Sequence, residues 1–195
     1  MRKLVFFVGG AGSGKTTLAK GITEKHPAVF LDMDTVSRRA SEKIMTIAGH
    51  DPNDRDSPAY KELCRDLGYE MTMDVALENL DLNLDVFAVG PFTSEIHNPD
   101  WIREALGKIG ASVEDVEVKV IYVYLSDMEQ YKQRIIDRGH KADEWKLAHW
   151  DEFVKRMERT DVVWELPGDS ILYFDNSAGS LEENIESLRK FVYGA

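Results

Sequence analysis

Apolar and polar residues fall into blocks along the chain, and five short apolar blocks stand out. They are rich in β-branched and aromatic side chains, and most are followed by a glycine or an aspartate. Blocks of this length and composition are typical of strands buried on both faces of a parallel sheet. They cover residues 4–8, 28–31, 86–89, 118–125 and 171–174.

The residues between these blocks show helical spacing and helix start signals. Ser57-Pro58 places a cap residue before a proline at the first helical position. The apolar face expected after it carries Tyr60, Leu63, Leu67 and Met71. Two Ser-x-x-Glu patterns predict capping boxes. They are Ser126 with Glu129 and Ser180 with Glu183. Strands that alternate with helices predict an α/β fold, and 195 residues are read as one domain, 1–195.

The first apolar block runs directly into a glycine-rich loop. Residues 9–16 (GGAGSGKT) match G-x-x-x-x-G-K-[T/S] in full, after a predicted strand and before a predicted helix. Backbone N–H groups of such a loop converge on phosphate oxygens, the lysine holds the β- and γ-phosphates, and the threonine hydroxyl ligates Mg²⁺. The loop therefore predicts binding of ATP with Mg²⁺. The residues expected to bind it are Gly10, Ala11, Gly12, Ser13, Gly14, Lys15, Thr16 and Thr17.

Two carboxylates follow the second apolar block. Asp32 and Asp34 stand where that strand is expected to end beside the P-loop, in the crevice where open α/β sheets bind ligands. One carboxylate could hold Mg²⁺ together with Thr16, and the other could accept the proton of a substrate hydroxyl. We assign the metal to Asp32 and the proton to Asp34, although the reverse stays open. The alternative for Asp34 is that it caps a helix starting near Thr35.

The remaining motifs narrow the class of nucleotide-binding protein. No asparagine is followed by lysine, so the N-K-x-D motif of GTPases is absent, as is the L-S-G-G-Q motif of transporter ATPases. The chain resembles the P-loop small-molecule phosphotransferases, a group with gluconate kinase, chloramphenicol phosphotransferase, zeta toxins and the kinase half of polynucleotide kinase. The features that carry the resemblance are the P-loop, residues 31–34 (LDMD) with Arg38, the pair Arg134 and Arg138, and residues 174–176 (FDN).

The resemblance implies a three-layer P-loop NTPase fold. Its five parallel strands would have the order 2-3-1-4-5, with a substrate-covering segment at 39–83 and a lid at 139–146. It implies substrate contacts for Asp34 and Arg38.

For the donor side, the resemblance implies that Arg134 and Asn176 contact adenine. Arg138 would neutralise charge on the transferred phosphoryl group, a role that suits the planar guanidinium. The alternative for both arginines is a solvated helix face. One departure is that relatives end the third strand in an acidic residue, whereas the first carboxylate after that strand here is Glu95.

Composition limits the partners. The net charge of −11, from 35 acidic and 24 basic residues, argues against nucleic acid. No apolar stretch is long enough to cross a bilayer and no signal-peptide pattern is present, so we expect no membrane contact. The single Cys64 suits a reducing compartment, and we therefore expect a cytoplasmic location. A homodimer through aromatic residues of segment 39–83 stays open.

These observations lead to one functional expectation and two alternatives. We expect an ATP- and Mg²⁺-dependent phosphotransferase that acts on a hydroxyl of a small-molecule substrate, with Lys15, Asp34 and Arg138 as catalytic groups. The alternatives are a regulatory module that binds and hydrolyses ATP without an acceptor, and a nucleotide or polynucleotide kinase. No motif in the sequence identifies the acceptor.

Overall fold

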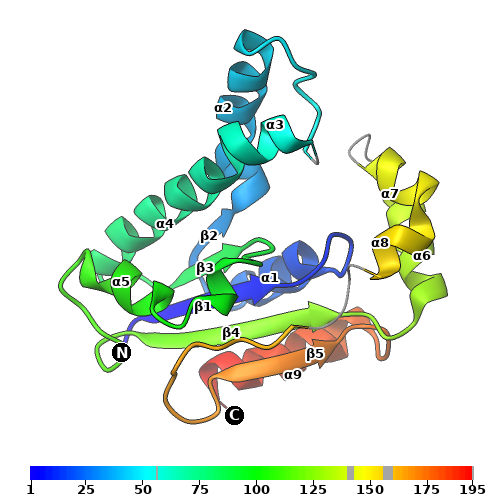
Figure 1. Cartoon of the computed structure of the whole chain (residues 1–195). Coiled ribbons are helices and arrows are strands. Elements are labelled where there is room, and N and C mark those ends of the chain that lie inside the picture. The colour runs from blue at the N-terminus through cyan, green and yellow to red at the C-terminus, as the bar shows by residue number, and fades with distance from the viewer. Residues whose placement is uncertain (56, 140–142, 156–159, 195) are drawn as a thin grey trace.

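A parallel sheet of five strands forms the centre of the protein. The computed structural model describes residues 1–55, 57–139, 143–155 and 160–194. The strand order is β2-β3-β1-β4-β5, which confirms the predicted fold class (Figure 1). The strands are β1 (Lys3–Val8), β2 (Val29–Asp32), β3 (Val86–Val89), β4 (Glu117–Tyr124) and β5 (Ile171–Asp175).

Helices connect the strands and surround the sheet. They are α1 (Lys15–Thr23), α2 (Met33–Ile47), α3 (Pro58–Tyr60), α4 (Asp66–Asp81), α5 (Trp101–Gly107), α6 (Met128–Arg138), α7 (Glu144–Ala148), α8 (Trp150–Lys155) and α9 (Leu181–Tyr193). Two further turns are irregular, the π-helical η1 (Lys61–Arg65) and the 3-10 turn η2 (Glu95–His97). Within the described ranges, no helix combines the length and the apolar character needed to cross a membrane.

The three central strands β3, β1 and β4 are largely buried, as the apolar blocks predict, whereas the edge strands β2 and β5 are mostly half-buried. Successive side chains of a strand point to opposite faces, so β1 supplies both cores. Val5 and Phe7 pack with α1 and α9, while Leu4 and Phe6 pack with α4 and α5. All four side chains are fully buried, and each buried side chain of this kind contributes about 1.5–3 kcal/mol. The central strand therefore anchors the loop that follows it.

Two groups of helices rise beyond the sheet and stand apart from each other (Figure 1). One group, called the arm here, consists of α2, the loop residues 48–55, α3, η1 and the start of α4, and has a small core that includes Met45, Tyr60 and Cys64. The other consists of α6, α7 and α8 and has its own core around Tyr131 and Ile135. Most of segment 39–83 lies in the arm. The expected lid at 139–146 is described in part, because residues 140–142 lie outside the described residues.

The turn η1 changes which residues of the arm are buried. The expected apolar face included Leu63, but Leu63 is 40% exposed and Cys64 is 1% exposed instead. A π-helical turn is wider than an α-helical one, so residues after Tyr60 rotate away from α-helical spacing. The expectation for Leu63 was therefore wrong.

The helix caps follow the sequence signals in part. The capping box of Ser180 and Glu183 is present at α9 and confirms that prediction. At α6, however, the cap is Asp127, whose carboxylate accepts a hydrogen bond from the Gln130 N–H at 3.0 Å, so the box expected at Ser126 was wrong. Both residues are good caps, and the later one is used because α6 begins only at Met128.

Candidate active site

The P-loop lies between the end of β1 and the first turn of α1, in a conformation that its glycines permit. Gly9 and Gly14 have positive φ angles of 126° and 100°. A Cβ atom at Gly9 would lie 2.2 Å from the Val123 carbonyl oxygen of β4. The loop therefore runs against the neighbouring strand so closely that only glycine fits.

The loop is also held from two other elements. The Tyr131 hydroxyl of α6 donates a hydrogen bond to the Ala11 carbonyl oxygen. Asn176, directly after β5, donates from Nδ2 to the Ser13 carbonyl oxygen at 2.8 Å, and its Oδ1 accepts from Asn184 at 2.9 Å. The phosphate-binding loop is thus fixed before any ligand arrives.

Lys15 extends along the loop it belongs to. Its Nζ donates hydrogen bonds to the carbonyl oxygens of Gly9 at 2.9 Å and Gly10 at 2.7 Å. Burial lowers the pKa of Lys15 to about 8, and the nearby carboxylates of Asp34 and Asp32 oppose this shift only in part. A buried ammonium with so little solvation gains strongly from an anionic ligand.

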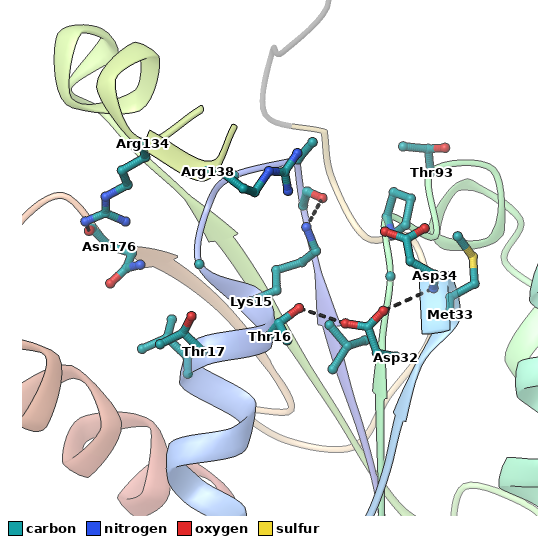
Figure 2. Close-up of a pocket in the computed structure, with 18 of the residues that line it drawn as sticks. Lys15, Thr16, Thr17, Asp32, Met33, Asp34, Thr93, Arg134, Arg138 and Asn176 are labelled. Atoms are coloured by element: carbon teal, nitrogen blue, oxygen red, sulfur yellow. Dashed lines mark hydrogen bonds between the residues drawn. The ribbon is translucent and has the colours of Figure 1, made fainter. Parts of the chain in front are cut away.

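Thr16 and Asp32 form a pair beside the lysine (Figure 2). The Thr16 hydroxyl donates to Asp32 Oδ2 at 2.8 Å. Asp32 Oδ1 accepts from the backbone N–H groups of Asp34 at 3.1 Å and Thr35 at 3.4 Å, so Asp32 is the N-cap of α2. The helix cap considered for Asp34 is therefore supplied by Asp32.

Asp34 presents its carboxylate to the pocket. It lies in the first turn of α2, it is exposed, and Figure 2 shows it on the far side of Asp32 from Thr16. Within the described part of the chain its carboxylate forms no hydrogen bond or ion pair, while its backbone N–H donates to Asp32. An unpaired carboxylate in a pocket can accept a hydrogen bond from a ligand.

These groups line one pocket of about 940 Å³. Its walls come from the P-loop and α1, from the ends of β2 and β3, from the arm, and from α6, α7 and α8. A pocket of this size is at the upper end of the range for small-molecule sites. It is therefore large enough for a nucleotide together with a second small molecule.

Two arginines of α6, Arg134 and Arg138, line the pocket, while the roles expected for them stay predictions. Arg134 donates from Nη2 to the Asn176 carbonyl oxygen at 2.9 Å, which holds its guanidinium beside the P-loop (Figure 2). Arg138 donates from Nε to Asp143 at 2.8 Å, and Lys146 of α7 donates to the same carboxylate at 2.8 Å. The Asp143 side chain is 1% exposed, and its bonds to these two cations hold its pKa below the usual range despite burial. Both cations line the pocket.

Two expected site residues lie differently. Arg38 is one turn beyond Asp34 on α2, is exposed, and is not among the described residues that line the pocket. Asn176 lines the pocket, but its side-chain amide is bonded to the P-loop and to Asn184, which favours a structural role. Its contact with adenine, like the substrate contact of Arg38, stays a prediction.

The arm supplies pocket residues that the sequence analysis did not assign. They are Arg55, Tyr60, Lys61, Arg65 and Tyr69. No motif marks them, although three cations within eleven residues of an acidic chain were a signal that could have been used.

Glu95 lies close to Arg65, one of these arm residues. Its side chain is 9% exposed, and Oε1 lies 3.7 Å from Nη2 of Arg65. Burial raises the pKa of the Glu95 carboxyl. The first carboxylate after β3 thus contacts the arm, and it is not among the described residues that line the pocket.

The residues present fit a magnesium ion held partly by a ligand. Among the described residues, no three His, Cys, Asp or Glu side chains form a metal-binding group. Mg²⁺ usually keeps several waters and takes one or two protein oxygens plus substrate phosphates. The oxygens of Thr16 and Asp32, paired beside the phosphate-binding loop, suit this kind of site.

The fold and the pocket define a P-loop protein of the kinase-like type, with helices on both sides of the phosphate-binding loop. The sequence profile of the AAA domain family matches residues 4–160, and the chain belongs to this family. A search of curated proteins found no matching sequence.

Solved structures of small-molecule kinases share the fold. A sugar kinase from a Janibacter species is 18% identical with a TM-score of 0.62, and the match covers 100% of this chain and 97% of that one. A gluconokinase from Sinorhizobium meliloti is 15% identical with a TM-score of 0.52, covering 100% and 93%. A shikimate kinase from Acinetobacter baumannii, in complex with shikimate, is 19% identical with a TM-score of 0.50, covering 98% and 93%. At these identities the likeness concerns the fold.

Proposed function

We propose that the protein transfers the γ-phosphoryl group of ATP to a hydroxyl of a small molecule. The observation that carries the proposal is the position of Asp34. Its carboxylate lines the same pocket as the P-loop, and it is not needed to cap α2, because the Asp32 carboxylate caps that helix. A hydroxyl of a second ligand in that pocket would find a proton acceptor facing the phosphates.

The P-loop and its neighbours would bind the donor. Lys15 would exchange its two carbonyl partners for the β- and γ-phosphates, since these anions solvate its charge better than the loop does. Thr16 and Asp32 would hold Mg²⁺, which would supply positive charge to the phosphate oxygens. Arg134, which lines the pocket, would stack on the nucleotide base.

The transfer itself requires one proton acceptor and charge stabilisation. The hydroxyl oxygen of the acceptor forms a bond to the γ-phosphorus while the bond from that phosphorus to the β–γ bridging oxygen breaks. ADP leaves, and the hydroxyl proton passes to Asp34. Arg138 would stabilise the negative charge on the transferred group, since it lines the pocket and Asp143 orients it.

An acceptor screen tests this proposal. The protein is incubated with Mg²⁺ and ATP labelled at the γ-phosphate, in the presence of metabolites, nucleosides and antibiotics, and the label is followed. We expect the label in an organic phosphate ester. Label found only in inorganic phosphate, with every class of hydroxyl compound present, would contradict transfer.

One observation favours a second candidate, a regulatory module that only binds and hydrolyses ATP. β3 ends at Val89 and continues into Gly90 and Pro91, so this strand offers no carboxylate to the phosphates. In that case binding and hydrolysis of ATP would alter the protein itself, and no second molecule would accept the phosphate. Hydrolysis at the same rate with and without every compound of the screen would favour this candidate.

A further inference from the structure

The charge of the pocket is opposite to that of the protein. Among its described lining residues are seven cationic side chains and two carboxylates, Asp32 and Asp34, whereas the whole chain carries a net charge of −11. Four of the cations lie on the P-loop side or on α6 and α7, where a triphosphate would use them. They are Lys15, Arg134, Arg138 and Lys146. The other three belong to the arm, and binding of the ATP phosphates does not explain why they line the pocket.

We define the arm wall as Arg55, Lys61 and Arg65. Lys61 and Arg65 are the first and last residues of the π-helical turn η1, and both line the pocket. π-helical turns are rare and occur frequently at functional sites, because the wider turn changes where side chains point. The irregular turn therefore brings two cations to one wall.

Arg65 is held in a fixed orientation. Its Nη1 donates to Asp66 at 2.7 Å and its Nη2 donates to the Ser94 hydroxyl at 2.6 Å. The guanidinium also lies over the Tyr69 ring, 5.3 Å from its centroid. A guanidinium has five N–H donors, and these two hydrogen bonds leave others for a ligand. The side chain is 28% exposed, so a ligand can reach it.

Arg55 approaches the same wall from the loop before α3. Its guanidinium lies over the ring of Tyr60, 5.1 Å from the centroid. Within the described ranges its only recorded interaction is this ring, and it lines the pocket together with Tyr60. A half-buried arginine that stacks on an aromatic ring is well placed to pair with a carboxylate or phosphate.

We propose that the arm wall binds an anionic group of the phosphoryl acceptor. The acceptor is then a small hydroxylated acid, with a hydroxyl at Asp34 and a carboxylate or a phosphate at Arg55, Lys61 and Arg65. This inference rests on the proposed function. Arg65 already pairs with Asp66 and lies near Glu95. Arg55 and Lys61, however, form no ion pair within the described residues, so a neutral polyol of the same size would leave these two cations without a counter-charge.

Calorimetric titration tests the inference directly. The protein is saturated with Mg²⁺ and the β,γ-imido analogue of ATP and titrated with matched probes. Gluconate and glycerate form the carboxylate set, glucose 6-phosphate and glycerol 3-phosphate form the phosphate set, and glucitol, glucose and glycerol are their neutral counterparts. We expect at least one anionic probe to bind roughly ten- to hundredfold more tightly than its neutral counterpart, as charge-assisted hydrogen bonds do. Which set contains it distinguishes carboxylate from phosphate.

Variants show whether the arm wall is responsible. Arg55→Gln and Arg65→Gln should each weaken the anionic probe roughly tenfold or more and leave the affinity for the ATP analogue unchanged. Lys61→Gln should also weaken the anionic probe. Because Lys61 is exposed, this variant should fold normally, so it still tests the arm wall if the arginine variants misfold. Arg39→Gln is the matched control, since Arg39 is 88% exposed on α2 and, among the residues that the structure describes, pairs only with Glu42.

The outcomes separate this inference from the proposed function. Equal binding of anionic and neutral probes, binding by none of them, or anionic binding that survives the arm-wall variants would overturn the inference. Phosphorylation of neutral probes alone would overturn it and support phosphoryl transfer. Anionic binding that depends on the arm wall, without any transfer of the γ-phosphate, would support the inference and contradict the proposed function.

Discussion

Replacing Lys15 with methionine should stabilise the protein while weakening its affinity for ATP. Burial lowers the pKa of Lys15 from 10.5 to about 8. A shift of this size corresponds to about 3 kcal/mol against the charged form in the folded state. The two hydrogen bonds to the carbonyl oxygens of Gly9 and Gly10 return about 1 kcal/mol each and are lost in the variant. At pH 7 we expect Lys15→Met to raise the free energy of unfolding by about 1–3 kcal/mol.

The stabilisation should depend on pH in a defined direction. Between pH 8 and 10.5 the unfolded chain keeps the Lys15 proton and the folded protein releases it, so the wild type gains stability as the pH rises. Its difference from Lys15→Met should therefore shrink above pH 8 by up to about 1.4 kcal/mol per pH unit. Other groups titrate equally in both proteins and cancel in the difference.

Urea denaturation of both proteins at pH 7, 8, 9 and 10 measures this difference, and calorimetry measures ATP affinity at pH 7. ATP should bind Lys15→Met roughly ten- to hundredfold more weakly. Lys43→Met, at an exposed position on α2, is the control and should change stability by less than about 0.5 kcal/mol at every pH. A less stable Lys15→Met protein at pH 7, or a difference that is constant from pH 7 to 10, would refute the reasoning.

Substitutions at three other residues should change stability or ATP binding in defined ways. Asp32→Asn should keep the cap of α2 but bind Mg²⁺–ATP more weakly in calorimetry, whereas Asp32→Ala should also lower the unfolding free energy by about 1 kcal/mol. Gly9→Ala, whose Cβ would meet a β4 carbonyl at 2.2 Å, should lower it by more than about 2 kcal/mol, while Gly107→Ala, with open space, should not lower it; equal effects in denaturation would argue against the close approach. Tyr131→Phe removes only the hydroxyl that holds a P-loop carbonyl and should weaken ATP binding by up to about fivefold, and unchanged affinity would count against that contact.

The sheet could be predicted from the sequence because its signals are local. Each strand is a short apolar block, and Gly9 to Thr16 form a contiguous motif between a strand and a helix. The placement of Asp32 and Asp34 follows from the same rule, since parallel strands end at one edge of the sheet. Local signals place the end of a helix only to within one or two residues, and the cap of α6 is Asp127 where Ser126 was expected.

The rest of the pocket depends on contacts that no local pattern records. The π-helical turn buries Cys64 in place of Leu63 and brings Arg65 to the pocket, and a spacing of 3.6 residues cannot anticipate it. The brace from Tyr131 to Ala11 joins residues 120 positions apart. Tertiary packing decides both features, so the acceptor side of the pocket was the part that the sequence left open.

The most direct test of phosphoryl transfer compares the wild type with Asp34→Asn in a single turnover of γ-labelled ATP, with Mg²⁺ and the best acceptor of the screen. The variant keeps the size and the helical position of the side chain but cannot take a proton from a hydroxyl. We expect equal ATP affinity in both proteins, label in the acceptor with the wild type, and transfer slower by roughly a hundredfold or more with Asp34→Asn. Transfer at the wild-type rate by Asp34→Asn would contradict the role of Asp34, and label that reaches only inorganic phosphate in the wild type would contradict the transfer itself.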